Sequence, residues 1–82
     1  MLKAYYVYVP TGEKLPVKDT LEFPEGASVT DVIDAVLQKV GHIKFYIRAS
    51  VFVERISWEH WKTSRAKDGI DIVVVSGGQG IP

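Results

Sequence analysis

Residues 28–41 read SVTDVIDAVLQKVG, and this stretch decides the fold. Ser28 is a preferred N-cap residue, and Asp31 places a carboxylate near the positive end of the helix dipole. Gly41 suits the left-handed position at which many helices end. The apolar residues recur at three- and four-residue spacing, which predicts one amphipathic helix with a single buried face. These residues are Val29, Val32, Ile33, Val36, Leu37 and Val40.

The sequence before this helix predicts a β-hairpin. Residues 3–9 are rich in Tyr and Val, which favour a half-buried strand, and the run stops at Pro10. The tetrapeptide PTGE at 10–13 is typical of a turn. Apolar and polar residues then alternate over residues 17–23, with Asp19 as the one acid in the apolar series. We expect these two strands to pair in antiparallel fashion.

The sequence after the helix predicts two further strands joined by a crossover. Every odd position from 43 to 53 is apolar, which favours a core strand near 48–54 preceded by an extended approach. Ser57 is expected to cap a single turn at 58–61, and AKDG at 66–69 is expected to form a tight turn. Residues 70–75 are nearly all apolar and β-branched, which favours a central strand.

Length, charge balance and Cys content limit the kinds of protein that this chain can be. A chain of 82 residues that is 46% hydrophobic suits one domain, which we place at residues 1–76, followed by a flexible Gly-rich tail at 77–82. Ten basic and ten acidic residues weigh against non-specific nucleic-acid binding. The absence of Cys excludes disulfides, thiolate metal sites and Cys nucleophiles. No apolar run approaches the length of a membrane span, so we expect a soluble protein that does not bind membranes.

The predicted order of elements is hairpin, helix, strand, crossover, strand. This order predicts an α+β fold of the β-grasp (ubiquitin-like) type, a mixed sheet of four to five strands with one helix packed across it. Residues 24–33, PEGASVTDVI, resemble the helix entry of the ThiS/MoaD sulfur-carrier superfamily. Residues 58–61 (WEHW), 67–70 (KDGI) and 77–78 (GG) resemble its C-terminal third. Membership would imply a β-grasp domain with an adenylating enzyme as partner.

The C-terminal pattern is also similar to β-grasp segments in tail-tip and host-specificity proteins of tailed phages. The residues that carry this likeness are Trp61, Arg65, Lys67, Asp68, Gly69, Gly77 and Gly78. The resemblance implies a small structural or assembly protein of a phage tail tip, with other tail or particle proteins as partners. Its location would be the virion or the host cytoplasm.

Two features depart from these families. Gly77-Gly78 is followed by residues 79–82, so a Gly carboxylate for carrier chemistry requires cleavage after Gly78. Glu54-Arg55 stands where an Asn-Gly type turn is common in these families, and neither residue favours the positive φ that such a turn needs. We therefore expect a different connection after the strand near 48–54.

Aromatic and Gly residues supply the candidate partner-binding site. Trp58 and Trp61 could anchor a partner, although Trp61 could instead pack over the sheet. Tyr5, Tyr6 and Tyr8 place aromatics on both faces of the first strand, so at least one phenol should face solvent. The candidate set is Tyr6, Trp58, Trp61, Arg65, Gly77, Gly78 and Gln79.

Catalytic groups are sparse. His42 and His60 are the only imidazoles, and no nucleophile, oxyanion loop or carboxylate pair accompanies them. The sequence therefore predicts a non-enzymatic interaction and assembly module that binds through a sheet edge, its aromatic residues and its C-terminal tail, without cofactor or metal. Two alternatives stay open: a sulfur carrier or ubiquitin-like modifier matured after Gly78, and a small inhibitor of a host protein.

Overall fold

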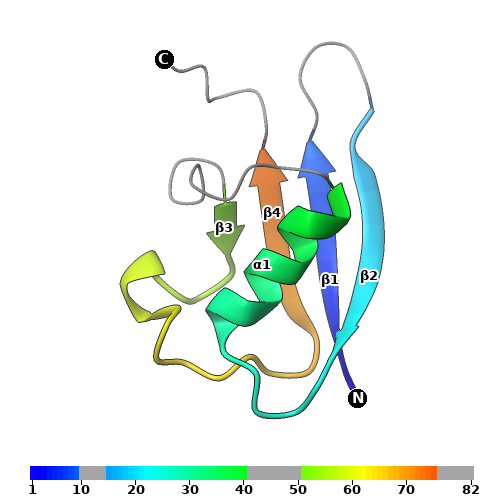
Figure 1. Cartoon of the computed structure of the whole chain (residues 1–82). Helices are drawn as coiled ribbons and strands as arrows, with labels where there is room; N and C mark the ends of the chain where they lie inside the picture. Colours follow the sequence, from blue (N-terminus) through cyan, green and yellow to red (C-terminus); the bar gives the residue numbers. More distant parts are fainter. Residues whose placement is uncertain (10–14, 41–50, 76–82) are drawn as a thin grey trace.

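The chain forms a small α+β domain with a four-stranded sheet and one α-helix (Figure 1). The computed structural model describes residues 1–9, 15–40 and 51–75. This architecture confirms the predicted α+β class and is compatible with a β-grasp-like arrangement. The elements are β1 (Leu2–Val9), β2 (Val17–Phe23), α1 (Val29–Val40), β3 (Val51–Val53), the short 3₁₀ turn η2 (Trp58–His60) and β4 (Ile70–Val75).

The sheet is mixed, with the strand order β2-β1-β4-β3. β1 pairs with β2 in antiparallel and with β4 in parallel orientation, while β3 and β4 are antiparallel. The predicted hairpin and the predicted interior position of residues 70–75 are both confirmed. The expected turn at 10–13 lies outside the described residues.

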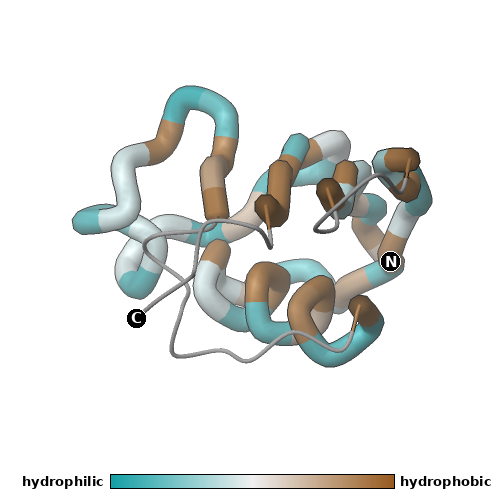
Figure 2. Tube along the Cα trace, turned by 90° about the horizontal axis from the view of Figure 1, so that it is seen from above, coloured by the Kyte–Doolittle hydropathy of each residue, from teal (hydrophilic) through white to brown (hydrophobic). Residues whose placement is uncertain are grey.

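The core lies between α1 and one face of the sheet. Seen from above, α1 runs along one side of the sheet, and hydrophobic and hydrophilic residues alternate along its turns (Figure 2). The predicted apolar face of the helix is buried, apart from Val40, which is half-buried. The strands contribute alternate residues to the same core, as the period of two requires. The buried strand residues are Ala4, Tyr6, Phe23, Val51, Val53, Ile70, Ile72 and Val74.

The N-terminus of α1 carries a reciprocal cap. The backbone N–H of Asp31 donates to Ser28 Oγ at 3.1 Å, and the N–H of Ser28 donates to Asp31 Oδ2 at 3.2 Å. Each side chain thus satisfies a backbone donor that the helix itself leaves without a partner. The predicted N-cap is confirmed. The expected end of the helix at Gly41 lies outside the described residues.

The chain between β3 and β4, residues 54–69, is called the crossover, and it holds the start of α1. Two further helix N–H groups donate to carbonyls of the crossover, and one crossover N–H donates to the carbonyl of Ala27, just ahead of the helix. The bonds run from Val29 to Ser64 (2.9 Å), from Thr30 to Trp61 (3.2 Å) and from Ala66 to Ala27 (2.9 Å). The crossover ends in the predicted tight turn, which Gly69 completes at φ +85°.

Three details of the region after α1 differ from expectation or refine it. The described part of the third strand is Val51–Val53, which ends one residue before the predicted end at 54, and positions 48–50 lie outside the described residues. The expected side-chain cap by Ser57 was wrong, because its hydroxyl makes no capping bond and its carbonyl accepts from the N–H of His60 (2.9 Å). Arg55 adopts φ 67°, a left-handed conformation that costs a non-glycine residue roughly 1–2 kcal/mol.

The connection after β3 therefore takes a form that the sequence did not favour. The N–H of Ile56 donates to the carbonyl of Val53 at 3.4 Å, so a turn does form at Glu54-Arg55. The chain then leaves the sheet as the crossover and does not return directly as a hairpin strand. The sequence argument against a positive φ at these two residues was therefore wrong, because Arg55 adopts φ 67° within the turn.

Replacement of Ile33 by Ala tests the core. Ile33 is fully buried on α1, so the variant loses apolar contacts and leaves a cavity. We expect the free energy of unfolding to fall by about 2–5 kcal/mol, measured by denaturant titration followed by circular dichroism. The matched control is Leu15→Ala, which truncates an aliphatic side chain that is 82% exposed and should change stability by less than about 0.5 kcal/mol. Equal losses would contradict this packing.

Candidate partner-binding surface

The sheet face opposite α1 carries a row of apolar side chains at its centre. The register aligns Val7 of β1 with Val73 of β4, and Val73 with Phe52 of β3. Lys18 of β2 lies at the other end of this row, beside Val7. A second row holds Thr20, Tyr5 and Asp71. We call the surface formed by these seven residues the open face.

The open face exposes two aromatic rings. Phe52 is 61% and Tyr5 is 47% exposed, while Val7 and Val73 are half-buried. Tyr5, Val7 and Val73 also line a shallow depression of about 570 Å³, together with neighbouring residues on β1, β2 and β4. Aromatic rings and β-branched side chains lie at the centre of the open face, and Lys18 and Asp71 lie beside them. This composition matches a protein interface with an apolar core and a charged rim.

Tyr6 lies on the opposite side of the sheet from this surface. Its side chain is 4% exposed and belongs to the core beneath α1. Burial raises the pKa of the Tyr6 phenol, and the charge of Asp19, its cross-strand neighbour, raises this pKa further. A partner cannot contact this ring without opening the core. The predicted solvent-facing phenol is Tyr5, because the side chains of successive residues in a strand point to opposite faces.

Trp61 also lies in the core. Its side chain is 6% exposed, and the indole Nε1–H donates to the carbonyl of Ile56 at 3.1 Å. The alternative in which Trp61 packs over the sheet is therefore the one observed. A buried indole with a satisfied N–H stabilises the crossover and is withdrawn from partners.

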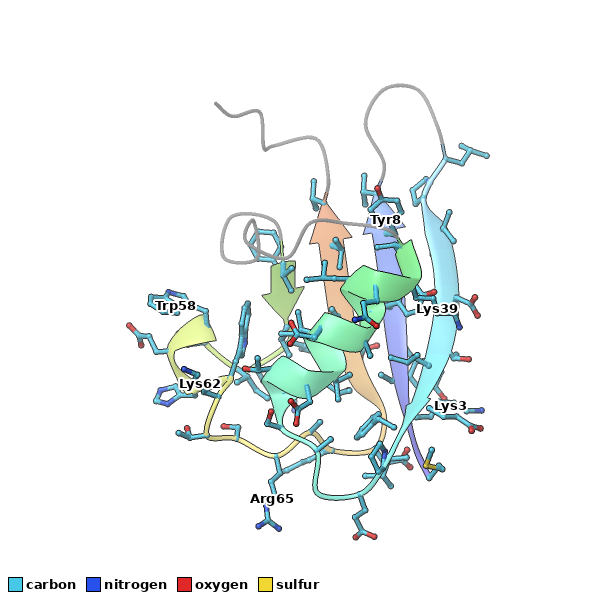
Figure 3. The ribbon with its side chains drawn as sticks, in the orientation of Figure 1. Lys3, Tyr8, Lys39, Trp58, Lys62 and Arg65 are labelled. Carbon is cyan, nitrogen blue, oxygen red and sulfur yellow. The ribbon has the colours of Figure 1, made fainter. Side chains whose placement is uncertain are left out.

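Trp58 and Arg65 lie on the outside of the crossover. Trp58 is 50% exposed at the start of η2, and Arg65 and Lys62 are exposed further along the crossover. Figure 3 shows Trp58 and Lys62 beyond β3, on the side of the domain away from β2, and Arg65 at the end of the domain below the start of α1. The structure thus separates the exposed crossover aromatic from Tyr6 and Trp61. Gly77, Gly78 and Gln79 lie outside the described residues.

Sequence reasoning missed Phe52 and Val73 as surface residues. The sequence did contain a signal for both residues. Each is a large apolar residue that stands between two buried positions of its strand, so its side chain points to the opposite face of the sheet. In β3 the buried positions are Val51 and Val53, and Phe52 stands between them. Apolar residues on both phases of a strand indicate either two covered faces or one face that binds something else.

The described residues were compared with the requirements of a metal site and of a membrane-spanning helix. Among residues 1–9, 15–40 and 51–75, no three His, Asp or Glu side chains come together as a metal site. No helix in this described part is long and apolar enough to cross a membrane. Comparison with protein-family models, with curated protein sequences and with solved structures gives no significant match.

Fluorescence quenching tests the opposite placements of the two Trp residues. In Trp58→Phe the remaining indole, Trp61, is buried, so its emission should lie at shorter wavelength and acrylamide should quench it weakly. In Trp61→Phe the remaining Trp58 should be quenched more strongly, and stability should fall because the bond to Ile56 is lost. Similar quenching of both single-Trp proteins in the folded state would contradict the placement.

Proposed function

We propose that this chain is a non-enzymatic β-grasp interaction module that binds another protein through the open face of its sheet. The observation that carries the proposal is the row Val7, Val73 and Phe52, which crosses three strands on the face opposite α1. Contact between such apolar surface and water is unfavourable in free energy. A partner that covers the surface is therefore bound with a hydrophobic contribution to the free energy of binding.

The chemistry of the open face specifies the partner surface. Phe52 and Tyr5 are exposed rings that can enter apolar pockets, as aromatic residues at interface centres commonly do. Lys18 and Asp71 place one charge of each sign beside them. The complementary surface is therefore an apolar patch of a folded protein that carries an acid opposite Lys18 and a base opposite Asp71. Such pairing fixes orientation more than it adds affinity.

The biological setting that we propose is a tailed-phage particle, with other tail-tip proteins as partners. Its support is the likeness of Trp61, Arg65, the turn at 67–69 and Gly77-Gly78 to tail-tip proteins. The structure adds that Trp61 and the turn at 67–69 belong to the crossover. Trp61 packs in the core, and the turn at 67–69 leads the chain into β4. Neither feature occupies the open face, which is left for assembly.

A sulfur carrier or ubiquitin-like modifier is the second candidate. The observation in its favour is the position of Gly77-Gly78 two residues after β4, an interior strand that runs parallel to β1. Such a protein would need cleavage after Gly78 before its partner, an adenylating enzyme, could act on the new carboxylate. The two candidates differ in the covalent state of the C-terminus.

Site-specific photocrosslinking in the natural source tests the proposal. A benzoylphenylalanine residue at position 52 should form one discrete adduct, because this ring lies on the open face. The same residue at position 15, which is also exposed, is the matched control and should form none. A third arm at position 58 asks whether the crossover aromatic contacts the partner instead. Intact mass of the captured chain reports whether it ends at Pro82 or at Gly78.

The result that supports an open-face interface is an adduct at position 52 that disappears when Val73→Lys is added. Circular dichroism must show that this second variant is folded. An adduct from position 58 alone, or equal adducts from positions 52 and 15, would contradict the open face as the binding surface. A chain that ends at Gly78, or that carries a thiocarboxylate there, would favour the carrier over the assembly module.

A further inference from the structure

The outer edge of β2 is the feature from which we draw a further inference. In the described part of the chain, β2 is an edge strand of the sheet. An edge strand turns a row of backbone N–H and C=O groups outward, where another strand can pair with them. Whether the edge is open to pairing depends on which groups point outward and what already binds them.

The hydrogen bonds of β1 identify the outward groups of β2. The carbonyl of Lys3 accepts from the N–H of Gly69 at 2.8 Å, and the N–H of Lys3 donates to Asp68 Oδ1 at 2.9 Å, so the backbone of Lys3 points toward the β4 side. Because successive residues alternate, Tyr5 and Val7 point the same way. Their partners on β2 then turn their own groups away from β1. These partners are Glu22, Thr20 and Lys18.

Side chains already bind both backbone groups of Thr20, the middle residue of this edge. Its N–H donates to Oδ1 of Asp19 at 2.7 Å, and its carbonyl accepts from Nζ of Lys39 at 3.4 Å. Lys39 comes from the last turn of α1 and reaches toward β2 (Figure 3). The two bonds come from separate elements, and they occupy the pair of groups that an added strand would need at Thr20.

We infer that Asp19 and Lys39 close the middle of the β2 edge at Thr20, which blocks a second copy of the domain or an extended segment of a partner from adding a strand across this residue. An incoming strand would have to displace the Asp19 carboxylate, at 2.7 Å from the Thr20 nitrogen, and the Lys39 ammonium group, at 3.4 Å from the Thr20 oxygen. This role also accounts for an acid at position 19, in the apolar phase of β2. Charged residues of this kind are one way in which proteins block edge pairing.

The inference does not depend on the proposed function, since it concerns the edge of the sheet and not its open face. It does restrict how a partner binds. Strand addition across Thr20 of β2 is blocked, whereas the open face stays accessible on the adjacent surface. A partner that buries Phe52 and Val73 therefore binds by side-chain packing and not by extension of the sheet at β2.

Sedimentation equilibrium of the full chain tests this block. The double variant Asp19→Ala, Lys39→Ala frees both backbone groups of Thr20, and we expect it to self-associate at least tenfold more tightly than the unmodified chain. The matched control, Asp34→Ala with Lys62→Ala, also removes one acid and one base but leaves Thr20 bound. It should associate like the unmodified chain.

Two further variants make the result specific to the edge. Addition of Thr20→Pro to the double variant removes the outward N–H, which edge strands tolerate, and should abolish the gain in association. Asp19→Thr with Lys39→Met keeps strand and helix propensity, so it replaces the first double variant if that one does not fold. The inference is overturned if the folded double variant associates no more tightly than the matched control. It is also overturned if the gain in association persists with Pro at position 20.

Discussion

The hydrogen bonds between the start of α1 and the crossover are the constraint on which the rest of the structure depends. Two N–H groups of the first helical turn, those of Val29 and Thr30, donate to Ser64 and Trp61 of the crossover. Trp61 adds a buried ring to the same junction and an indole bond to Ile56. The crossover then delivers the chain into β4, which pairs with β1. Helix, crossover and central strands are thereby held as one unit.

This junction fixes the helix over one face of the sheet and thereby determines which surfaces are left for partners. The covered face buries Ile72 and Val74, whereas the opposite face presents Val73 and Phe52. At the β2 edge, Lys39 from the end of the helix donates to the outward carbonyl of Thr20 and so helps to block strand addition there. The same helix therefore covers one face of the sheet and helps to protect one edge of it. The open face is the surface that this arrangement offers for binding.

Much of the fold could be predicted from periodicity and end signals. The spacing of apolar residues and the cap at Ser28 located α1, and alternation located β2 at Val17–Phe23. The candidate site was harder to predict, because alternation shows that a strand has two phases but not which phase faces the helix. Tyr6 was chosen although Tyr5 occupies the exposed phase. The contact of Lys39 with Thr20 spans 19 positions in the sequence, and no local pattern indicates it.

Amide hydrogen exchange at the start of α1 tests whether the helix, the crossover and the sheet open as one unit. If the crossover and the helix form one unit with the sheet, the N–H groups of Val29 and Thr30 should exchange only through global unfolding, at the same free energy as the ladder amides of β1 and β4. Exchange of these two amides through a local opening, at a free energy well below that of the ladder, would show that the crossover detaches independently. That result would contradict a single cooperative unit of helix, crossover and sheet.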